Sequence, residues 1–373
     1  CEGNNATFSL SADGTNLNYQ WQSDASGSWQ DLSDGGDISG STTNSLTISN
    51  TDETDEADFR CQVTGDCGNV TSTTVTLTVN PNTQISSQPS NQRVCEGNDA
   101  VFNVSANGTN LSYQWRSDIS GSWADITDGG DISGATTSTL TIANAANADE
   151  ANYRVVVSGS CGPDQTSATV SLTVDDATVI TSQPVAQTVC EGTDATFSLN
   201  ATGSNITFQW QTNASGSWQD LTDGGDISGA TTNTLTIGNT DDTDEADYRC
   251  IVTGDCGTVN SNGVALTVNP NTQITSQPSA QTVCEGNDAI FSVSADGSSL
   301  TYQWQSDISG SWADLTDGGD ISGSTTNTLT IANAANADEA NYRVVVSGDC
   351  GPDQTSNGVN LTVNDATQIT SQP

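Results

Sequence analysis

The chain has 373 residues, a length typical of two to four domains. Only 33% of the residues are hydrophobic and 5% are aromatic, so any core is thin and built from strands. The 46 acidic residues outnumber 6 Arg, and the net charge of −40 argues against nucleic acid or anionic lipid as a partner. No segment approaches the roughly 20 apolar residues of a membrane helix, so we expect no direct membrane insertion.

From the N-terminus onward, short segments that alternate apolar and polar residues predict strands. The first set is ATFSLSA (6–12), NYQWQ (18–22), SLTIS (45–49), FRCQVTG (59–65) and VTLTV (75–79). A period of two is typical of a half-buried strand, and the Gly, Asn, Asp and Ser clusters between the segments are turn formers. About seven strands in about 94 residues predict an antiparallel sandwich.

The same set of strands occurs four times along the chain. The phrase CEG begins at Cys1, Cys95, Cys190 and Cys284, and a Trp ends the phrase YQW or FQW at Trp21, Trp115, Trp210 and Trp304. We therefore divide the chain into module 1 (1–79), module 2 (83–174), module 3 (178–268) and module 4 (272–363). Module 1 lacks the first strand of the others, and residues 367–373 repeat that strand, as the start of a following or neighbouring domain.

The order of these landmarks resembles the immunoglobulin superfamily. Tyr-x-Cys or Tyr-x-Val follows forty residues after the Trp of the third strand, as at Trp210 and Cys250 or Trp304 and Val344. The resemblance implies an all-β chain of four tandem immunoglobulin-like β-sandwich domains. Phrases such as SQPSAQTVCEGNDA and GDCG are also similar to the tandem repeats of large secreted surface proteins and adhesins of Bacteroidota. That similarity implies an extracellular, cell-surface location.

The usual disulfide of this superfamily cannot form here, because the second strand has no cysteine at the required position. That position is occupied by Leu10, Val104, Leu199 and Val293. Each module instead carries two cysteines 66 residues apart, so we predict one disulfide inside each module. The predicted pairs are Cys1 with Cys67, Cys95 with Cys161, Cys190 with Cys256, and Cys284 with Cys350. Such bonds require an oxidising compartment outside the cytoplasm.

Two further cysteines, Cys61 and Cys250, follow the tyrosine corner in modules 1 and 3. One interpretation is an interchain disulfide or a reactive thiol. The other is a buried free thiol that fills the place of valine in modules 2 and 4, and we favour it.

Short polar linkers separate the modules: 80–82, 175–177, 269–271 and 364–366. Three residues are too few for a flexible tether, so we expect the modules to form a rod of about 160 Å. The segment 367–373 has two interpretations: the chain is a slice of a longer array, or this segment completes module 1 of another copy by strand addition. We expect self-association, either head to tail or laterally.

The repeated loop DGGD is the candidate metal site. Two carboxylates flank two glycines, and hard oxygen ligands suit calcium. The candidate ligands are Asp34 and Asp37, Asp128 and Asp131, Asp223 and Asp226, and Asp317 and Asp320. A tight turn with solvated aspartates explains the motif equally well.

A second Trp lies eight residues after the first in every module: Trp29, Trp123, Trp218 and Trp312. Such side chains can stack on sugars, which makes them candidate glycan contacts; the alternative is a half-buried packing role. No His, Lys or Met is present, and no catalytic motif is found, so we expect no enzyme.

The sequence favours a structural repeat region of an extracellular bacterial surface filament, stalk or adhesin shaft that acts by rigid extension and self-association. Two alternatives stay open: a glycan- or protein-binding module of a secreted protein, and a repeat spacer in a secreted multidomain enzyme.

Overall fold

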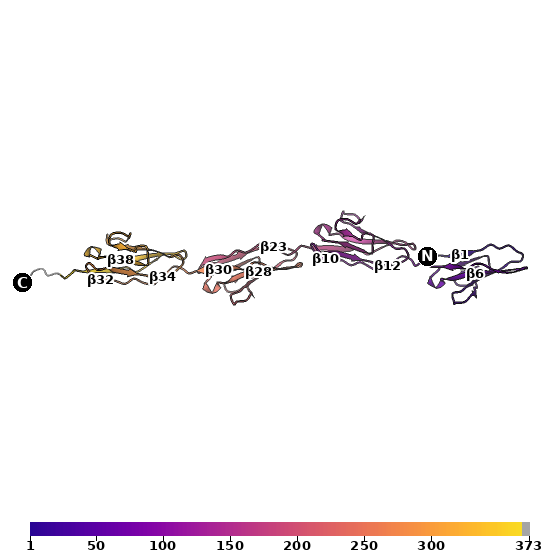
Figure 1. The fold of residues 1–373 in the computed structure, drawn as a ribbon, viewed down its shortest axis with the longest axis horizontal. Coiled ribbons are helices and arrows are strands. Elements are labelled where there is room, and N and C mark those ends of the chain that lie inside the picture. The colour runs from indigo at the N-terminus through magenta and orange to yellow at the C-terminus, as the bar shows by residue number, and fades with distance from the viewer. Residues whose placement is uncertain (368–373) are drawn as a thin grey trace, which may run out of the picture. The chain divides into compact units, whose positions relative to one another are not determined.

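The structure is a computed structural model that describes residues 1–367. It divides into unit 1, Cys1–Asp176, and unit 2, Ala177–Pro373. Each unit contains two consecutive β-sandwich modules (Figure 1). The segment predicted to add a strand, 367–373, lies outside the described residues except for Thr367.

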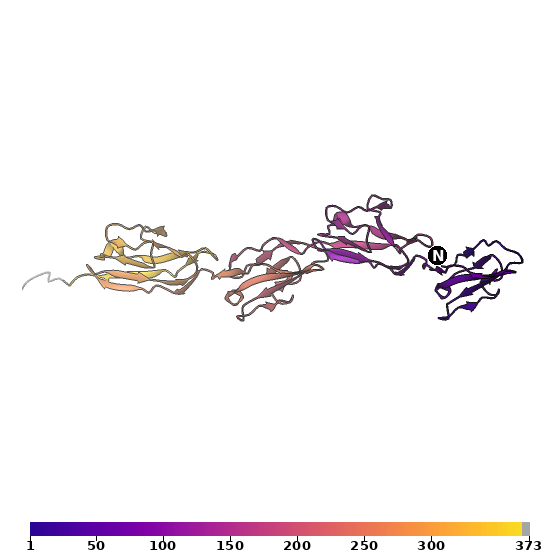
Figure 2. The same cartoon turned by 45° about the vertical axis from the view of Figure 1, so that its right-hand side comes forward.

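Module 2 shows the complete arrangement of strands. Its larger sheet has the order β10-β19-β17-β13-β14, with β18 on β17, and its smaller sheet the order β11-β16-β15. The strands are β9 (Gln84–Ser87), β10 (Gln92–Cys95), β11 (Ala100–Asn103), β12 (Ser105–Asn107), β13 (Ser112–Ser117), β14 (Ala124–Asp125), β15 (Ile132–Ser133), β16 (Thr139–Ile142), β17 (Asn152–Ser158), β18 (Gln165–Thr166) and β19 (Val170–Asp175). Figure 2 shows the two layers.

The first strand of module 2 is split between the two sheets. Its first part, β9, pairs antiparallel with β12, and its second part, β10, pairs parallel with β19. One continuous segment, 83–95, therefore closes an edge of each sheet.

Modules 3 and 4 repeat this plan. Module 3 contains β20 (Val179–Ser182), β21 (Gln187–Cys190), β22 (Ala195–Ser198), β23 (Asn200–Thr202), β24 (Thr207–Thr212), β25 (Gln219–Asp220), β26 (Ile227–Ser228), β27 (Thr234–Ile237), β28 (Asp247–Gly254), β29 (Gly257–Asn260) and β30 (Val264–Asn269). Module 4 contains β31 (Gln273–Ser276), β32 (Gln281–Cys284), β33 (Ala289–Ser292), β34 (Ser294–Asp296), β35 (Thr301–Ser306), β36 (Ala313–Asp314), β37 (Ile321–Ser322), β38 (Thr328–Ile331), β39 (Asn341–Ser347), β40 (Gln354–Thr355) and β41 (Val359–Asn364).

Module 1 has fewer strands. It contains β1 (Ala6–Ser9), β2 (Asn18–Ser23), β3 (Gln30–Asp31), β4 (Ile38–Ser39), β5 (Ser45–Ile48), β6 (Ala57–Gly65), β7 (Gly68–Thr71) and β8 (Val75–Leu77). Module 1 has no strand that corresponds to β9 or β10. The residues that match β12, the partner of β9 in module 2, do not form a strand in module 1.

The helices are one short 3₁₀ turn per module, just before the tyrosine corner: η1 (Glu53–Asp55), η2 (Asn147–Asp149), η3 (Asp242–Asp244) and η4 (Asn336–Asp338). Among the described residues, no helix has the length and apolar character needed to cross a membrane.

Each core is centred on the Trp of the third strand. In module 2, the rings of Phe102 and Tyr153 stack with centroids 5.1 Å apart, and Trp115 is fully buried beside them. The Trp115 indole N–H donates to the Thr137 carbonyl at 2.9 Å, so its one polar group is satisfied. The fold confirms the predicted all-β class of tandem immunoglobulin-like sandwiches.

Candidate functional site: the covalent junctions between modules

The disulfides join consecutive modules. Cys1 of module 1 bonds to Cys161 of module 2, and Cys190 of module 3 bonds to Cys350 of module 4, each pair with Cα atoms 5.4 Å apart. Cys95 and Cys256 are also disulfide-bonded. Cys67 and Cys284 are free and exposed. The CEG cysteine of one module thus bonds to the Gly-Ser-Cys-Gly or Gly-Asp-Cys-Gly cysteine of the next.

The prediction of a disulfide inside each module was therefore wrong. None of the four predicted pairs is bonded: Cys1 with Cys67, Cys95 with Cys161, Cys190 with Cys256, and Cys284 with Cys350. The reason lies in the parallel pairing of β10 with β19, which sets Cys95 opposite Asp175 at the end of β19, whereas Cys161 precedes its start. Six strand residues span about 20 Å, and a disulfide tolerates a Cα separation of about 7 Å at most.

Cys61 and Cys250 are free and buried, on the strands β6 and β28. Burial raises the pKa of the Cys250 thiol to about 11 and that of the Cys61 thiol in the same direction. A raised pKa keeps the thiol protonated at neutral pH, and the thiolate is the reactive form. The two side chains therefore act as small apolar groups of the core.

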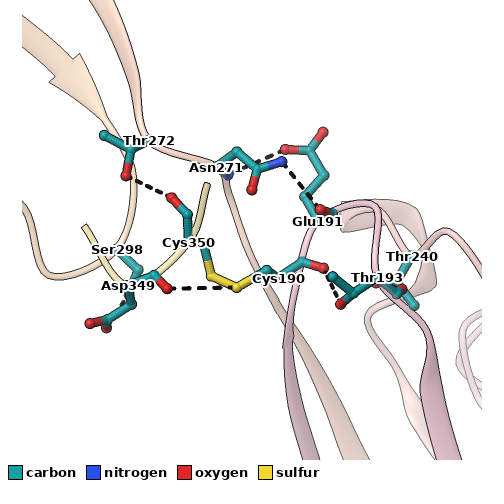
Figure 3. The surroundings of a disulfide bond; sticks show 9 residues. All are labelled: Cys190, Glu191, Thr193, Thr240, Asn271, Thr272, Ser298, Asp349 and Cys350. Atoms are coloured by element: carbon teal, nitrogen blue, oxygen red, sulfur yellow. Dashed lines mark hydrogen bonds between the residues drawn. A yellow bond between two sulfur atoms is a disulfide. The ribbon is translucent and has the colours of Figure 1, made fainter. Parts of the chain in front are cut away.

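Within a unit, the linker is hydrogen-bonded to the preceding module, and the residue that follows the linker is hydrogen-bonded within its own module beside the disulfide. In unit 2, the Asn271 side-chain amide donates to the Glu191 carbonyl at 3.2 Å, while Thr272 donates to the Cys350 carbonyl through its backbone N–H at 2.8 Å and its hydroxyl at 2.7 Å (Figure 3). The Cys190 sulfur lies 3.8 Å from the Asp349 carbonyl oxygen; because a disulfide sulfur carries no hydrogen, this is a van der Waals contact.

Unit 1 has the same junction. Asn82 donates to the Glu2 carbonyl at 3.2 Å, and Thr83 donates to the Cys161 carbonyl through its N–H and its hydroxyl, both at 2.8 Å. Beside the disulfide, Gly162 has φ of +79°, and a Cβ there would lie 3.2 Å from Asn82. Glycine at this position lets the linker pass close to the hairpin.

A polar hollow of about 610 Å³ lies at this junction, lined by Glu2, Thr51, Asn82, Gln84 and Gln165 among others. Its lining offers hydrogen-bonding groups but no apolar floor, so it lacks the character of a small-molecule pocket.

Module 1 carries a groove of about 530 Å³ along the edge that β9 covers in module 2. Leu10, Leu17, Val63 and Val70 line the groove, and so does the free Cys67. Val70 is 72% exposed. This groove was not foreseen from the sequence, although the missing first strand of module 1 was.

The candidate calcium ligands of the DGGD loops serve a turn. Gly35 and Ile38 exchange two backbone hydrogen bonds, and Gly36 between them has φ of +59°, a conformation that favours glycine. The Ser41 N–H donates to Asp34 Oδ1 at 2.7 Å, and hydrogen bonds from the Ser41 side chain and backbone lower the pKa of Asp34.

The three later copies keep the same bond: Asp128 accepts from Ala135, Asp223 from Ala230 and Asp317 from Ser324. Residues 1–367 contain no group of three or more Cys, Asp or Glu that is placed to hold a metal ion. No such group in this part of the chain therefore includes the second aspartate of the DGGD loop, at Asp37, Asp131, Asp226 or Asp320.

The second Trp of each module is covered by an arginine. The guanidinium carbons of Arg60, Arg154, Arg249 and Arg343 lie 4.0 to 4.3 Å from the ring centroids of Trp29, Trp123, Trp218 and Trp312. Because the arginine occupies one face of the ring, the contact is a cation–π interaction that packs the module. The Cζ2 and Cη2 atoms of Trp218 also approach Gly263, where a Cβ would lie 3.3 Å from both. This arrangement favours packing over sugar stacking.

The fold and its junctions define a protein of tandem immunoglobulin-like domains. The chain belongs to the family described as "Domain of unknown function (DUF8696)", which matches residues 1–81, 180–270 and 273–365. Residues 83–174 match the immunoglobulin I-set domain.

Two curated proteins are similar in sequence. Endoglucanase C of Cellulomonas fimi is 39% identical over 126 residues, which are 33% of this chain and 11% of that protein. Muscle M-line assembly protein unc-89 of Caenorhabditis elegans is 27% identical over 322 residues, 82% of this chain and 4% of that protein. The chain thus spans a small part of the length of the curated relatives that it matches.

Solved structures share the fold. An I-band fragment of titin has a TM-score of 0.58 at 17% identity and covers 78% of this chain and 100% of its own. The eight N-terminal immunoglobulin domains of Down Syndrome Cell Adhesion Molecule have a TM-score of 0.52 at 16% identity, covering 96% of this chain and 49% of their own.

Proposed function

We propose that the chain is an extension region of an extracellular protein, in which covalently joined modules give reach to a bacterial surface filament, stalk or adhesin shaft. The observation that carries the proposal is the disulfide that joins the two modules of each unit, Cys1–Cys161 in unit 1 and Cys190–Cys350 in unit 2.

The argument is mechanical. A linker of three residues restricts the distance between two modules but still allows them to rotate. A disulfide adds a second point of attachment, so that rotation is left only about the axis through both points. The hydrogen bond from the linker residue Asn82 to the Glu2 carbonyl of module 1 then opposes that rotation. A spacer that must transmit position or force needs this kind of junction.

The cysteines and the charge support the proposed location. Six of the ten cysteines are disulfide-bonded, which fits an oxidising compartment outside the cytoplasm. The net charge of −40 makes the surface self-repelling, and this opposes collapse of a long chain on itself.

Small-angle X-ray scattering tests this proposal. We expect the oxidised protein to give a maximum dimension near the length of four sandwiches in line, about 160 Å. The double variant Cys161→Ser/Cys350→Ser should give a broader distribution of shorter distances. Cys67→Ser is the matched control, because Cys67 has the same place in module 1 but no disulfide. A compact particle in the oxidised protein would contradict the proposal.

A second candidate is a repeat spacer in a secreted enzyme. The 39% identity with Endoglucanase C over 126 residues, 11% of that protein, supports it. The complete native polypeptide would then hydrolyse a polysaccharide, while the isolated 373-residue chain would not. An assay of both on cellulose separates this candidate from the surface shaft.

A further inference from the structure

Three of the four modules share a row of hydrogen-bonded side chains on the outer face of the larger sheet. In module 4, Arg343 Nε donates to the side-chain oxygen of Gln305 at 2.7 Å, and the Gln305 amide donates to Asp314 at 2.8 Å. Modules 1 and 3 have the same row, with Gln22 and Gln211 in the middle. In these modules, an uncharged acceptor therefore satisfies the arginine that covers the second Trp.

Module 2 departs from this arrangement, because Arg116 stands where the other modules have the glutamine. Arg116 lies directly opposite Arg154, the arginine that covers Trp123, in the paired strands β13 and β17. Arg116 Nε lies 2.8 Å from Asp125 Oδ1, whereas Arg154 Nε is buried with no hydrogen-bond partner among residues 1–367. Two guanidinium groups thus share a single carboxylate.

This arginine pair costs stability. Like charges on directly opposed residues of two strands repel one another, and a buried donor without an acceptor adds a further penalty. Features that break a local rule at a cost are typical of functional sites. An anion placed between the two guanidinium groups would remove the repulsion and accept hydrogen bonds from the planar donor fork of each.

The site is open to such a ligand, and its charge favours a carboxylate. The Arg116 side chain is 32% exposed and that of Asp125 is 61% exposed. Two arginines and one aspartate leave one positive charge in excess, which one carboxylate neutralises. A phosphate or sulfate dianion would bring a surplus negative charge to a chain whose net charge is already −40.

Modules 1 and 3 present a carboxylate of this kind on their 3₁₀ turns. Asp52 and Asp55 of η1 accept hydrogen bonds from the backbone of the turn itself. Glu53 between them is exposed, and its carboxylate has no partner among the residues that the structure describes. Asp242 has the same place in η3, whereas modules 2 and 4 have asparagine there.

We propose that Arg116 and Arg154 of module 2 form a carboxylate-binding site for the acidic 3₁₀ turn of a second copy of this chain, with Glu53 or Asp242 as the ligand. Each copy carries both the site and the ligand, so a twofold arrangement makes two equivalent contacts. Two exposed ion pairs that are weak alone then act together. The contact goes beyond the proposed function, because it holds equally for a shaft and for a spacer.

Sedimentation of complementary variants tests the proposal at an ionic strength of about 0.15 M, where charges more than about 8 Å apart are screened. Arg116→Gln removes the site, and Glu53→Gln/Asp242→Asn removes the ligand. We expect the wild type to self-associate reversibly and each variant to associate at least about fivefold more weakly. An equimolar mixture of the two variants should associate more strongly than either alone, because site and ligand are again both present.

Two further variants separate the site from the net charge. Arg116→Gln combined with Asp13→Asn, at an exposed position of module 1, keeps the net charge of the wild type and should still weaken the association. Gln305→Arg builds the same arginine pair in module 4 and should strengthen it. Arg116→Gln is expected to fold, because glutamine is the residue of the other three modules.

Three outcomes would overturn the proposal: no self-association of the wild type up to about 1 mM, an association constant unchanged in Arg116→Gln, or a mixture that associates no better than its separate components. None of them affects the scattering test of the proposed function, because that test is made on dilute single chains and depends on the disulfides within one chain.

Discussion

Modules 1 and 2 contain the same landmark residues but differ in how well their cores are closed. Phe102, Val104 and Val157 are buried in module 2, whereas the matching Phe8, Leu10 and Val63 of module 1 are half-buried. The difference comes from the segment 83–94, which has no counterpart in module 1. The first strand therefore does two things at once: it closes the core, and it carries the linker that binds the preceding module.

The largest effect should come from supplying the missing strand. We expect the sequence TQITSQPSAQTV, fused before Cys1, to raise the free energy of unfolding of module 1 by more than about 4 kcal/mol, because several apolar side chains become buried. Hydrogen exchange followed by mass spectrometry resolves module 1 from the others. The same extension with Asp in place of its Ile is the control, and equal protection by both would show that the groove does not select the strand.

The next largest effect should come from the disulfides. Cys161→Ser should lower the free energy of unfolding of unit 1 by about 2 to 5 kcal/mol, since the bond closes a loop of 160 residues. Cys67→Ser, at the matching position in module 1, should change it by less than about 0.5 kcal/mol. Urea unfolding under non-reducing conditions measures both. A similar loss in the two variants would mean that Cys67 also has a partner in the isolated chain.

The tyrosine corner offers a smaller contrast. The hydroxyl of Tyr153 donates to the Asp149 carbonyl at 2.6 Å, and module 1 has Phe59 at the same position. Tyr153→Phe should therefore cost about 1 kcal/mol, and Phe59→Tyr should stabilise module 1 by a similar amount if the hydroxyl reaches the equivalent carbonyl. Thermal unfolding of the two variants measures both changes. An unchanged melting temperature in both would show that the hydrogen bond of the tyrosine corner does not contribute to stability.

The same corner predicts a pH dependence. Burial, followed by the nearby Asp338 and Asp307, raises the pKa of Tyr342 to about 12, above its ordinary value of 10. Because the pKa of Tyr342 is higher in the folded state, the protonated hydroxyl contributes to the free energy of unfolding. This contribution is complete below pH 10 and is lost as the pH rises to 12. Calorimetry between pH 8 and 12 should show a steeper fall for the wild type than for Tyr342→Phe. Parallel curves would contradict this assignment.

The smallest effect concerns Arg116 in β13. The other modules have Gln at this position, and Gln22, Gln211 and Gln305 accept a hydrogen bond from the arginine that covers the Trp. In module 2, Arg116 lies opposite Arg154 in the neighbouring strand. Arg116→Gln should restore the acceptor and stabilise module 2 by about 0.5 to 1 kcal/mol, despite the loss of its ion pair with the exposed Asp125. Chemical denaturation measures the change, and Gln305→Arg should act in the opposite direction.

The sequence by itself determined the number of modules, their strands and their class. The period of two, the fourfold repeat and the Trp-to-Tyr spacing are local signals, and local signals specify strands and turns. The sequence also indicated the incomplete start of module 1. The sequence left open whether the DGGD loop binds calcium or only forms a turn, because glycine and aspartate suit both a turn with positive φ and a calcium-binding loop.

Only the tertiary structure decided the cysteine pairing. A separation of 66 residues within a module and one of 160 residues between modules are equally regular along the chain, so spacing could not choose between them. In unit 2, the parallel pairing of β21 with β30 sets the CEG cysteine Cys190 opposite Asn269 at the end of β30, where it bonds to Cys350 of module 4 and not to Cys256 of its own module. A disulfide is a contact in space. The partner of a cysteine therefore depends on the direction of its strand and on the position of the neighbouring module, and the sequence of a single repeat contains neither.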